Sequence, residues 1–529
     1  MSSSPARVRA LAIGLCLACA LGAPMSRSAD GLQPVEARPG SNDVLVEMGA
    51  LGAPDTSGLG LLTPSESGMP KSMWTGTPRS RADALLEHVP KPTRSRALQS
   101  LGHRVLLTEA NAPQNDGATA NFLALRLNRL IALGDLESVV RISDELIVGK
   151  DTSEEQEARA DALLLRGADG DACLMARQML PFGADIYWTK LDAYCKARSG
   201  DAAGGEFNLA LIRERDPDPV FFTLYDRLVL PKGDSVQPAP FDGSALAFAF
   251  LRASKSVPDS TEFISDQPAF LRAVSLDAGG TSADVRLTAA VTAAAFGAFP
   301  IDALRALFTL QGFAQEALAD PPRAAGPMVP ARALALFYQA IAQSPSPLER
   351  VKLASVAYRY AARHDIGPVL IDLASPLLDG IAPDRSLAPF AFDMTQASLA
   401  AGDSDGAARW FAAMPSVPPS GVDPVRFERL RAAMSADRNT LAAVTSNAVV
   451  PSGAGEPGAP MAAFTAASGE GRVAEGILLA LQVFDGRTPA QAGDGVVGPI
   501  VAGLANLGLA GDAQAILREA ALTAPDLTP

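Results

Sequence analysis

Residues 130–140 read LIALGDLESVV, and this stretch decides the fold class of the chain. Apolar residues recur at helical spacing before Gly134, and they recur again after Asp135. Glycine can adopt the left-handed conformation that ends one helix, and aspartate can accept hydrogen bonds from the free N–H groups that begin the next. The stretch therefore predicts two helices joined by a tight turn, and the apolar face of each helix must pack against a neighbour.

The same dipeptide recurs between apolar helical stretches elsewhere in the chain. The predicted turns are Gly134-Asp135, Gly170-Asp171, Gly200-Asp201, Gly402-Asp403 and Gly511-Asp512. The first three are 36 and 30 residues apart, from 134 to 170 and from 170 to 200. Because no sustained alternation of apolar and polar residues predicts a sheet, we expect an all-α array of antiparallel helix hairpins.

This rhythm resembles the tetratricopeptide family of α-solenoid repeats, whose period is ~34 residues. The resemblance covers roughly residues 76–524 and rests on the helix–turn–helix pattern and the Gly-Asp turns. The fixed Trp, Gly-Tyr, Ala and Pro positions of the family signature are absent. The resemblance implies an α-solenoid with a protein-binding or scaffolding role, and it transfers no catalytic residue to this chain.

Composition agrees with helices and excludes one class of partner. Apolar residues make up 48% of the chain and aromatic residues only 6%, with a large share of alanine that suits close-packed helices. The net charge of −13 becomes −16 without the first 28 residues, which contain three arginines and no acid. An acidic surface without a basic cluster repels phosphate backbones, so we expect no nucleic-acid partner.

The N-terminus predicts export. Arg7 and Arg9 precede the uncharged run ALAIGLCLACALGA at 10–23, and small residues follow, which is the order of a secretory signal peptide. We expect cleavage after Ser28, with Gly22 as a competing position, and a periplasmic or secreted protein. The run is too short to span a membrane comfortably. A lipid anchor at the cysteines of this run is the alternative, which their poor match to the lipoprotein pattern disfavours.

Segments rich in Gly, Pro and Ser interrupt the helical pattern and predict the domain organisation. After the signal peptide (1–28) we expect a flexible leader over 29–75 with docking patches at 44–46 and 59–62. Order should begin at Trp74, and proline-rich loops are expected at 213–219 and 319–330. The remaining predicted units are an N-terminal helical-repeat subdomain (76–230), a linker (231–243), a C-terminal helical-repeat subdomain (244–524) and a tail (525–529).

Cys173 and Cys195 are the cysteines that remain after signal cleavage. If 172–180 and 185–198 are antiparallel helices that turn near Gly183, the two cysteines differ in height by two residues, about 3 Å along the helix axis. In an oxidising compartment this favours a disulfide. Two separately buried thiols and metal ligation are the alternatives.

The remaining motifs predict no catalytic, metal or cofactor site. His88, His103 and His364 are the only histidines, and no metal-binding or nucleophile motif surrounds them. Pro457 interrupts the GxGxxG match at Gly453, Gly455 and Gly458, which lacks a βαβ context and predicts a loop. We expect the tryptophans to anchor the core and the acidic pair 154–155 to be a solvated first helical turn.

Together these features predict an exported, non-catalytic helical-repeat scaffold that binds protein or peptide partners in the cell envelope. The alternative is an α/α-superhelical enzyme or accessory protein that acts on peptidoglycan or polysaccharide. A deep acidic cleft with two carboxylates at catalytic separation would indicate that alternative. A third possibility is an outer-surface or lipid-anchored structural component.

Overall fold

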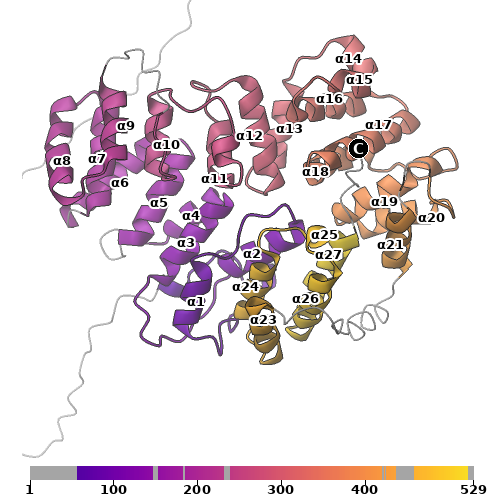
Figure 1. Cartoon of the computed structure of the whole chain (residues 1–529), viewed down its shortest axis with the longest axis horizontal. Coiled ribbons are helices and arrows are strands. Elements are labelled where there is room, and N and C mark those ends of the chain that lie inside the picture. Colours follow the sequence, from indigo (N-terminus) through magenta and orange to yellow (C-terminus); the bar gives the residue numbers. More distant parts are fainter. Residues whose placement is uncertain are drawn as a thin grey trace, which may run out of the picture. The chain divides into compact units, whose positions relative to one another are not determined.

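The computed structural model describes residues 56–146, 153–182, 185–230, 239–419, 422, 424–435 and 458–521. Helices dominate these residues and no strand occurs among them (Figure 1). The predicted signal peptide, residues 29–55 of the leader, the patch at 44–46, linker residues 231–238, Gly453, Gly455 and the tail lie outside the described residues. The all-α prediction is confirmed for the described part of the chain.

The described helices are short, from 4 to 17 residues in length. The first group is α1 (Arg79–Leu86), α2 (Arg96–Leu107), α3 (Phe122–Leu133), α4 (Leu136–Ser143), α5 (Ser153–Leu165), α6 (Asp169–Met179), α7 (Ile186–Ser199), α8 (Ala202–Arg215) and α9 (Pro219–Val229). The second group is α10 (Ala245–Ala253), α11 (Pro268–Ser275), α12 (Ala283–Ala295), α13 (Ile301–Thr309), α14 (Gln315–Ala319), α15 (Pro321–Ala325), α16 (Pro330–Gln343), α17 (Pro347–Arg363) and α18 (Gly367–Leu378). The last group is α19 (Ala391–Ala400), α20 (Ser404–Ala412), α21 (Pro424–Ser435), α23 (Ala459–Gly469), α24 (Val473–Phe484), α25 (Pro489–Ala492), α26 (Asp494–Asn506) and α27 (Ala510–Ala521). Short 3-10 turns are η1 (Thr56–Gly58), η2 (Pro64–Glu66), η3 (Leu180–Phe182), η4 (Glu262–Ile264) and η5 (Ala388–Phe390).

Consecutive helices pack in pairs, as the hairpin prediction requires. The closest pairs are α7 with α8, α11 with α12, α19 with α20, α23 with α24 and α26 with α27. The segment at 319–330 was predicted to be a loop or a subdomain joint, and the loop prediction is wrong because α15 lies inside it. Proline at the first position of α15 and α16 explains the difference, since it suits a helix start as well as a loop.

Three Gly-Asp dipeptides form the predicted turn. Gly134, Gly200 and Gly402 have φ of +82°, +81° and +77° and end helices α3, α7 and α19. Asp135, Asp201 and Asp403 then accept a backbone N–H as N-caps of α4, α8 and α20. The side chain thereby satisfies a donor that the first helical turn leaves free.

The other two dipeptides lie inside helices, so their prediction as turns is wrong. Gly170 and Asp171 belong to the first turn of α6, and Gly511 and Asp512 belong to the first turn of α27. The left-handed glycines are instead Gly167 and Gly508, at φ of +79° and +80°. Each earlier glycine ends the preceding helix first, and the acidic residue then lies where the helix dipole favours negative charge.

The predicted flexible leader is too long, because residues 56–75 pack onto α2 and α3. The Leu61 and Leu62 N–H groups both donate to the Leu107 carbonyl, at 2.7 and 3.0 Å, which confirms docking of the patch at 59–62. Met69, Met73 and Trp74 are at most 3% exposed. These apolar anchors are spaced irregularly, so no helical period announces them.

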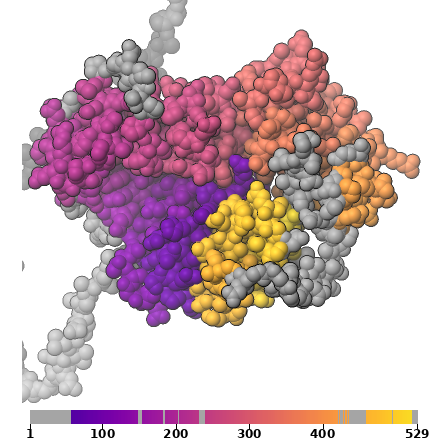
Figure 2. Space-filling model, viewed as in Figure 1, coloured from indigo at the N-terminus to yellow at the C-terminus, as the bar shows by residue number. Residues whose placement is uncertain are grey.

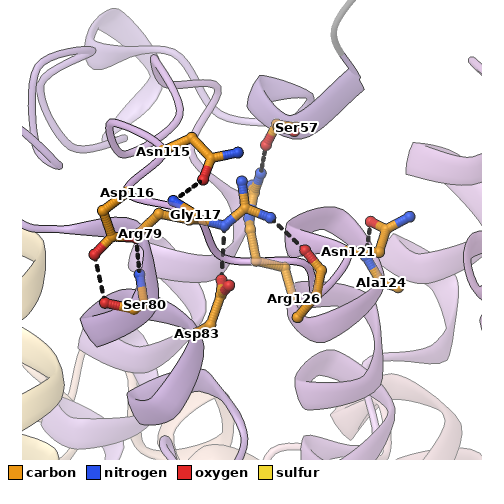
Figure 3. A network of polar contacts seen from close by, with 11 residues as sticks. Ser57, Arg79, Ser80, Asp83, Asn115, Asp116, Gly117, Asn121, Ala124 and Arg126 are labelled. Carbon is orange, nitrogen blue, oxygen red and sulfur yellow. Dashed lines mark hydrogen bonds and ion pairs between the residues drawn. The ribbon is translucent and has the colours of Figure 1, made fainter.

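A fully buried arginine fastens this segment to the helices. The Arg126 guanidinium donates to the Leu106 and Thr108 carbonyls at the end of α2 and to the Ser57 carbonyl in η1. Burial lowers the pKa of Arg126 to about 10. Figure 3 shows the contact between Arg126 and Ser57 beside the Arg79–Asp83 ion pair, whose nitrogen and oxygen are 2.7 Å apart. The backbone carbonyls of the connecting segments thus gain partners that secondary structure does not supply.

One continuous core extends from Met69 to Ile516, and a smaller cluster surrounds Phe427. The predicted boundary at 231–243 separates helices that share this core, since α10 packs against α5, α7 and α9. Phe241, within the described part of the predicted linker, lies edge-on to Phe263 and Phe270. Aromatic packing therefore continues across the boundary.

The last helices contact the first ones within the compact unit of residues 53–529. Helix α24 packs against α1 and α2, and α27 packs against α2 (Figures 1 and 2). Ion pairs reinforce this joint, with 2.6 Å between Arg104 and Asp512 and between Lys91 and Asp485. Glu519 accepts hydrogen bonds from the Ser95 hydroxyl and the Ala97 N–H at the start of α2. In a simple solenoid each repeat contacts only its neighbours. The contacts of α24 and α27 with α1 and α2 therefore depart from a simple solenoid, because they join helices far apart in the sequence.

A disulfide joins α6 and α7. Cys173 and Cys195 are bonded, with 5.7 Å between their Cα atoms, which confirms the predicted pair. None of the described helices combines the length and apolar character that crossing a bilayer requires. Trp74, Trp188 and Trp410 are all buried, as expected for core anchors.

Candidate functional site

A cavity of about 360 Å³ lies among α5, α7, α9 and α10, and we call it the acidic cavity. Residues of these four helices, Asn128 of α3 and the residues just before α9 and α10 supply its lining. Its volume lies near the lower end of the range for ligand pockets, about 300–1,000 Å³. Asn128, Glu154 and Asp242 line it and are exposed, so its rim is accessible to solvent.

Helix starts position the polar side chains of the acidic cavity. Glu154, Glu157 and Asp161 follow one another at spacings of three and four residues, which places them on one face of α5. Asp218 caps α9 by accepting the Val220 and Phe221 N–H groups. Each carboxylate is therefore fixed by the rigid helix on which it lies or which it caps.

Two carboxylates of α5 are held by neutral donors. The Ser153 hydroxyl donates to Glu157 at 3.0 Å and accepts a hydrogen bond from the Trp188 indole N–H at 2.9 Å. The Tyr187 hydroxyl donates to Asp161 at 2.7 Å. These bonds orient the two carboxylates without neutralising their charge.

The environment favours the protonated form of both groups. Burial raises the pKa of Glu157 to about 7, and the charges of Asp185, Asp161 and Glu154 act in the same direction. Burial also raises the pKa of Asp161 to about 6, although the Tyr187 hydrogen bond opposes the rise. Both groups therefore titrate near neutral pH, which is typical of carboxylates in functional sites.

The cation that lines the acidic cavity is already paired. Lys190 Nζ lies 2.7 Å from an Asp216 oxygen and 2.9 Å from an Asp218 oxygen. Burial opposes its charge, but the hydrogen bonds to these two carboxylates outweigh that effect and raise the pKa of Lys190. Within the described part of the chain, no Lys or Arg forms an ion pair with Glu157 or Asp161.

Apolar side chains complete the acidic cavity. Phe221 and Phe250 lie edge-to-face with 5.5 Å between ring centroids, and Leu224 and Leu246 lie beside them in the lining. Such a wall lowers the local dielectric and strengthens interactions with charge. Among the described residues, no group of three or more His, Cys, Asp or Glu side chains is arranged to hold a metal ion.

A larger cavity of about 620 Å³ lies among the segment that precedes α2, helices α17 and α18, and residues 485–491. Its charges are balanced internally, because Lys91 pairs with Asp485 and Arg94 with Asp365. The acidic cavity instead retains uncompensated negative charge. We therefore regard the acidic cavity as the candidate site.

The residues singled out from the sequence lie elsewhere. The Gly-Asp turns are distributed along the chain, and the disulfide joins α6 to the C-terminal half of α7, away from the cavity-lining residues of that helix. His103 contacts the Gln99 carbonyl, His364 lies against the Tyr360 ring, and His88 lines a third cavity. Gly458 precedes α23 as its N-cap residue.

Sequence reasoning missed Glu157 and Asp161, although their spacing was visible. The acidic pair 154–155 was expected to be solvated, but only Glu154 is exposed. Glu155 is 2% exposed and accepts a hydrogen bond from the Thr56 hydroxyl. An acidic stripe on one helix face was the available signal. Which helices face that stripe is decided by the tertiary fold and could not be predicted from the spacing.

No family model, curated protein or solved structure matches the chain significantly. The function is therefore inferred from the geometry of the described residues.

Proposed function

We propose that the protein is an exported, non-catalytic scaffold of tetratricopeptide-like helix hairpins that binds a protein or peptide partner in the cell envelope. The partner would contact the accessible rim of the acidic cavity and insert one group into it. The signal peptide predicted at the N-terminus and the disulfide between α6 and α7 support an oxidising compartment.

The observation that carries this proposal is the acidic cavity itself. It combines an exposed polar rim with an aromatic wall and two carboxylates that lack an ionic partner in the described part of the chain. Surfaces that recognise peptides commonly combine an apolar pocket for one side chain with polar groups that fix its orientation. Rigid helices hold this arrangement in place before a partner arrives, which reduces the entropic cost of binding.

The raised pKa values of Glu157 and Asp161 also support the second candidate, an enzyme or accessory protein that acts on peptidoglycan or polysaccharide. Glycosidases use a protonated and an ionised carboxyl group on opposite sides of the scissile bond. Glu157 and Asp161 are instead one turn apart on α5, where Cβ atoms are about 5–6 Å apart on the same side. With both carboxylates on the same side, Glu157 and Asp161 are better placed to bind one ligand group together than to act from opposite sides of a scissile bond.

Site-specific photocrosslinking tests the proposal. A photoreactive amino acid at Asn128, on the rim, should crosslink the exported protein to a defined envelope protein or peptide. The same probe at Leu310, which is 79% exposed and does not line the acidic cavity, is the control. Equal or absent crosslinking at both positions contradicts the proposal, and release of soluble fragments from purified cell wall by the protein favours the second candidate.

A further inference from the structure

We infer that the acidic cavity binds a positively charged nitrogen, the ammonium or guanidinium of a Lys or Arg side chain that the partner presents. This inference rests on the proposed function, because the partner would deliver the side chain. It goes further by naming the chemistry that the cavity recognises.

Charge is the first argument. Glu154, Glu157 and Asp161 line one side of the cavity along α5, and Asp218 and Asp242 line it from the segments that precede α9 and α10. The single lysine in the lining is shared between Asp216 and Asp218. Glu157 and Asp161 accept hydrogen bonds from neutral hydroxyls but form no ion pair with a Lys or Arg among the described residues. A cation that enters the cavity therefore gains a charge interaction that the described part of the chain does not supply.

The walls are the second argument. A Lys or Arg side chain has an apolar stem below its charged head, and it buries that stem wherever an apolar surface is available. Phe221, Leu224, Leu246 and Phe250 provide such a surface beside the carboxylates. Lys190 already illustrates the preference, since its Nζ lies 5.7 Å from the Phe221 ring centroid.

Titration gives a diagnostic signature. The groups that line or face the cavity are Glu154, Glu157 and Asp161 on α5, Asp185, Tyr187 and Lys190 at α7, Asp218 at α9 and Asp242 before α10. A bound cation favours the ionised carboxylates and therefore lowers their raised pKa values. Binding near pH 6 should release protons, and affinity should fall as the pH is lowered from 8 to 5.

Calorimetry with defined peptides provides the test. The probes are acetyl-Gly-Gly-Lys-Gly-Gly-amide, its arginine counterpart, and the neutral peptide whose lysine is ε-acetylated, each titrated into the full-length exported protein. Wild type should bind the two cationic peptides and not the neutral one. Titration with n-butylamine measures binding of the charged group alone. A lysine peptide should bind more tightly than n-butylamine if the peptide also contacts the rim of the cavity.

Glu157→Gln and Asp161→Asn are the informative variants, since each removes a charge with little change in shape. Each should weaken binding of the lysine peptide by about tenfold, the loss expected for one charged hydrogen bond. Asp171→Asn, an exposed acid in α6, should bind as wild type does. Because burial in the folded protein disfavours the charged form of Glu157, the neutral amide should fold normally, which circular dichroism checks.

Two results would overturn the inference. One is equal binding of the lysine and ε-acetyl-lysine peptides, and the other is unchanged affinity in both amide variants. If the rim crosslink to a partner persists undiminished in Glu157→Gln and Asp161→Asn, the proposed function stands and the inference fails. If n-butylamine binds in a carboxylate-dependent way while no crosslinked partner exists, the cavity recognises a cation as inferred, but the proposed function and delivery of the cation by a protein partner both fail.

Discussion

Removing the Cys173–Cys195 bridge should destabilise the hairpin of α6 and α7 locally. The bond joins residues 22 positions apart. Closing a loop of that size lowers the entropy of the unfolded chain enough to stabilise the folded state by about 3 kcal/mol in the chain-entropy model. The Cα separation of 5.7 Å lies in the ordinary range for disulfides, so native-state strain should subtract little from this value.

The double variant Cys173→Ala/Cys195→Ala is the appropriate change, because both side chains are buried and alanine adds no polar group. Hydrogen exchange should show opening free energies about 3 kcal/mol lower in α6 and α7. Exchange in α23 and α24 should change much less, because these helices pack mainly against α1, α2 and α26 and each other. Fluorescence of Trp188, which is 1% exposed on α7, reports the same loosening during urea unfolding.

Reduction provides the matched control. Dithiothreitol should lower the stability of the wild-type protein to that of the double variant and leave the variant unchanged. Equal protection of α6 and α7 in oxidised wild type and double variant would refute the entropic argument. Free thiols at both positions in correctly exported protein would refute the bridge itself.

Three further predictions concern caps and buried carboxyls. Asp201→Ala should lower the free energy of unfolding by about 1 kcal/mol in urea titrations, because Asp201 caps α8, whereas Asp171→Ala should cost much less since Asp171 makes no capping bond. Glu519→Ala should cost about 1–3 kcal/mol in the same assay by removing the acceptor at the start of α2, and Glu519→Gln, which keeps an acceptor, should cost less. The pKa of Glu157 in the folded protein is raised to about 7, so the contribution of Glu157 to stability should increase as the pH falls from 8 towards 5. Melting curves of Glu157→Gln should lack this increase. Parallel pH profiles of the melting temperature for wild type and Glu157→Gln would contradict the prediction.

Local signals predicted the hairpins because the physics of helix ends is local. A left-handed glycine and a capping aspartate act within a few residues, so Gly134 and Gly200 could be assigned from neighbouring residues alone. The same reasoning misplaced the turn at Gly170, because Gly167 stands three residues earlier and ends the preceding helix first. A short-range rule cannot rank two glycines that both satisfy it.

Residues 56–75 show a different failure. Their order depends on the carbonyl of Leu107, on the guanidinium of Arg126 and on burial of Trp74, all of which lie on or against other elements. Irregular segments that borrow hydrogen bonds from distant helices carry no period of their own. The Gly- and Pro-rich composition therefore suggested flexibility where tertiary contacts impose order.

Residues from both sides of the predicted boundary at 231–243 form the acidic cavity. Helices α5, α7 and α9 precede that boundary, whereas Ser244 and Phe250 belong to the start of α10 and to α10 itself, which follow it. The negative stripe on α5 could be read from the sequence, but the aromatic wall opposite it could not, because Phe221 and Phe250 meet only in the folded chain. A fragment that ended before the boundary would keep Glu157 and Asp161 and lose the α10 side of the cavity. A complete acidic cavity therefore requires both predicted subdomains to fold as the single core that they share.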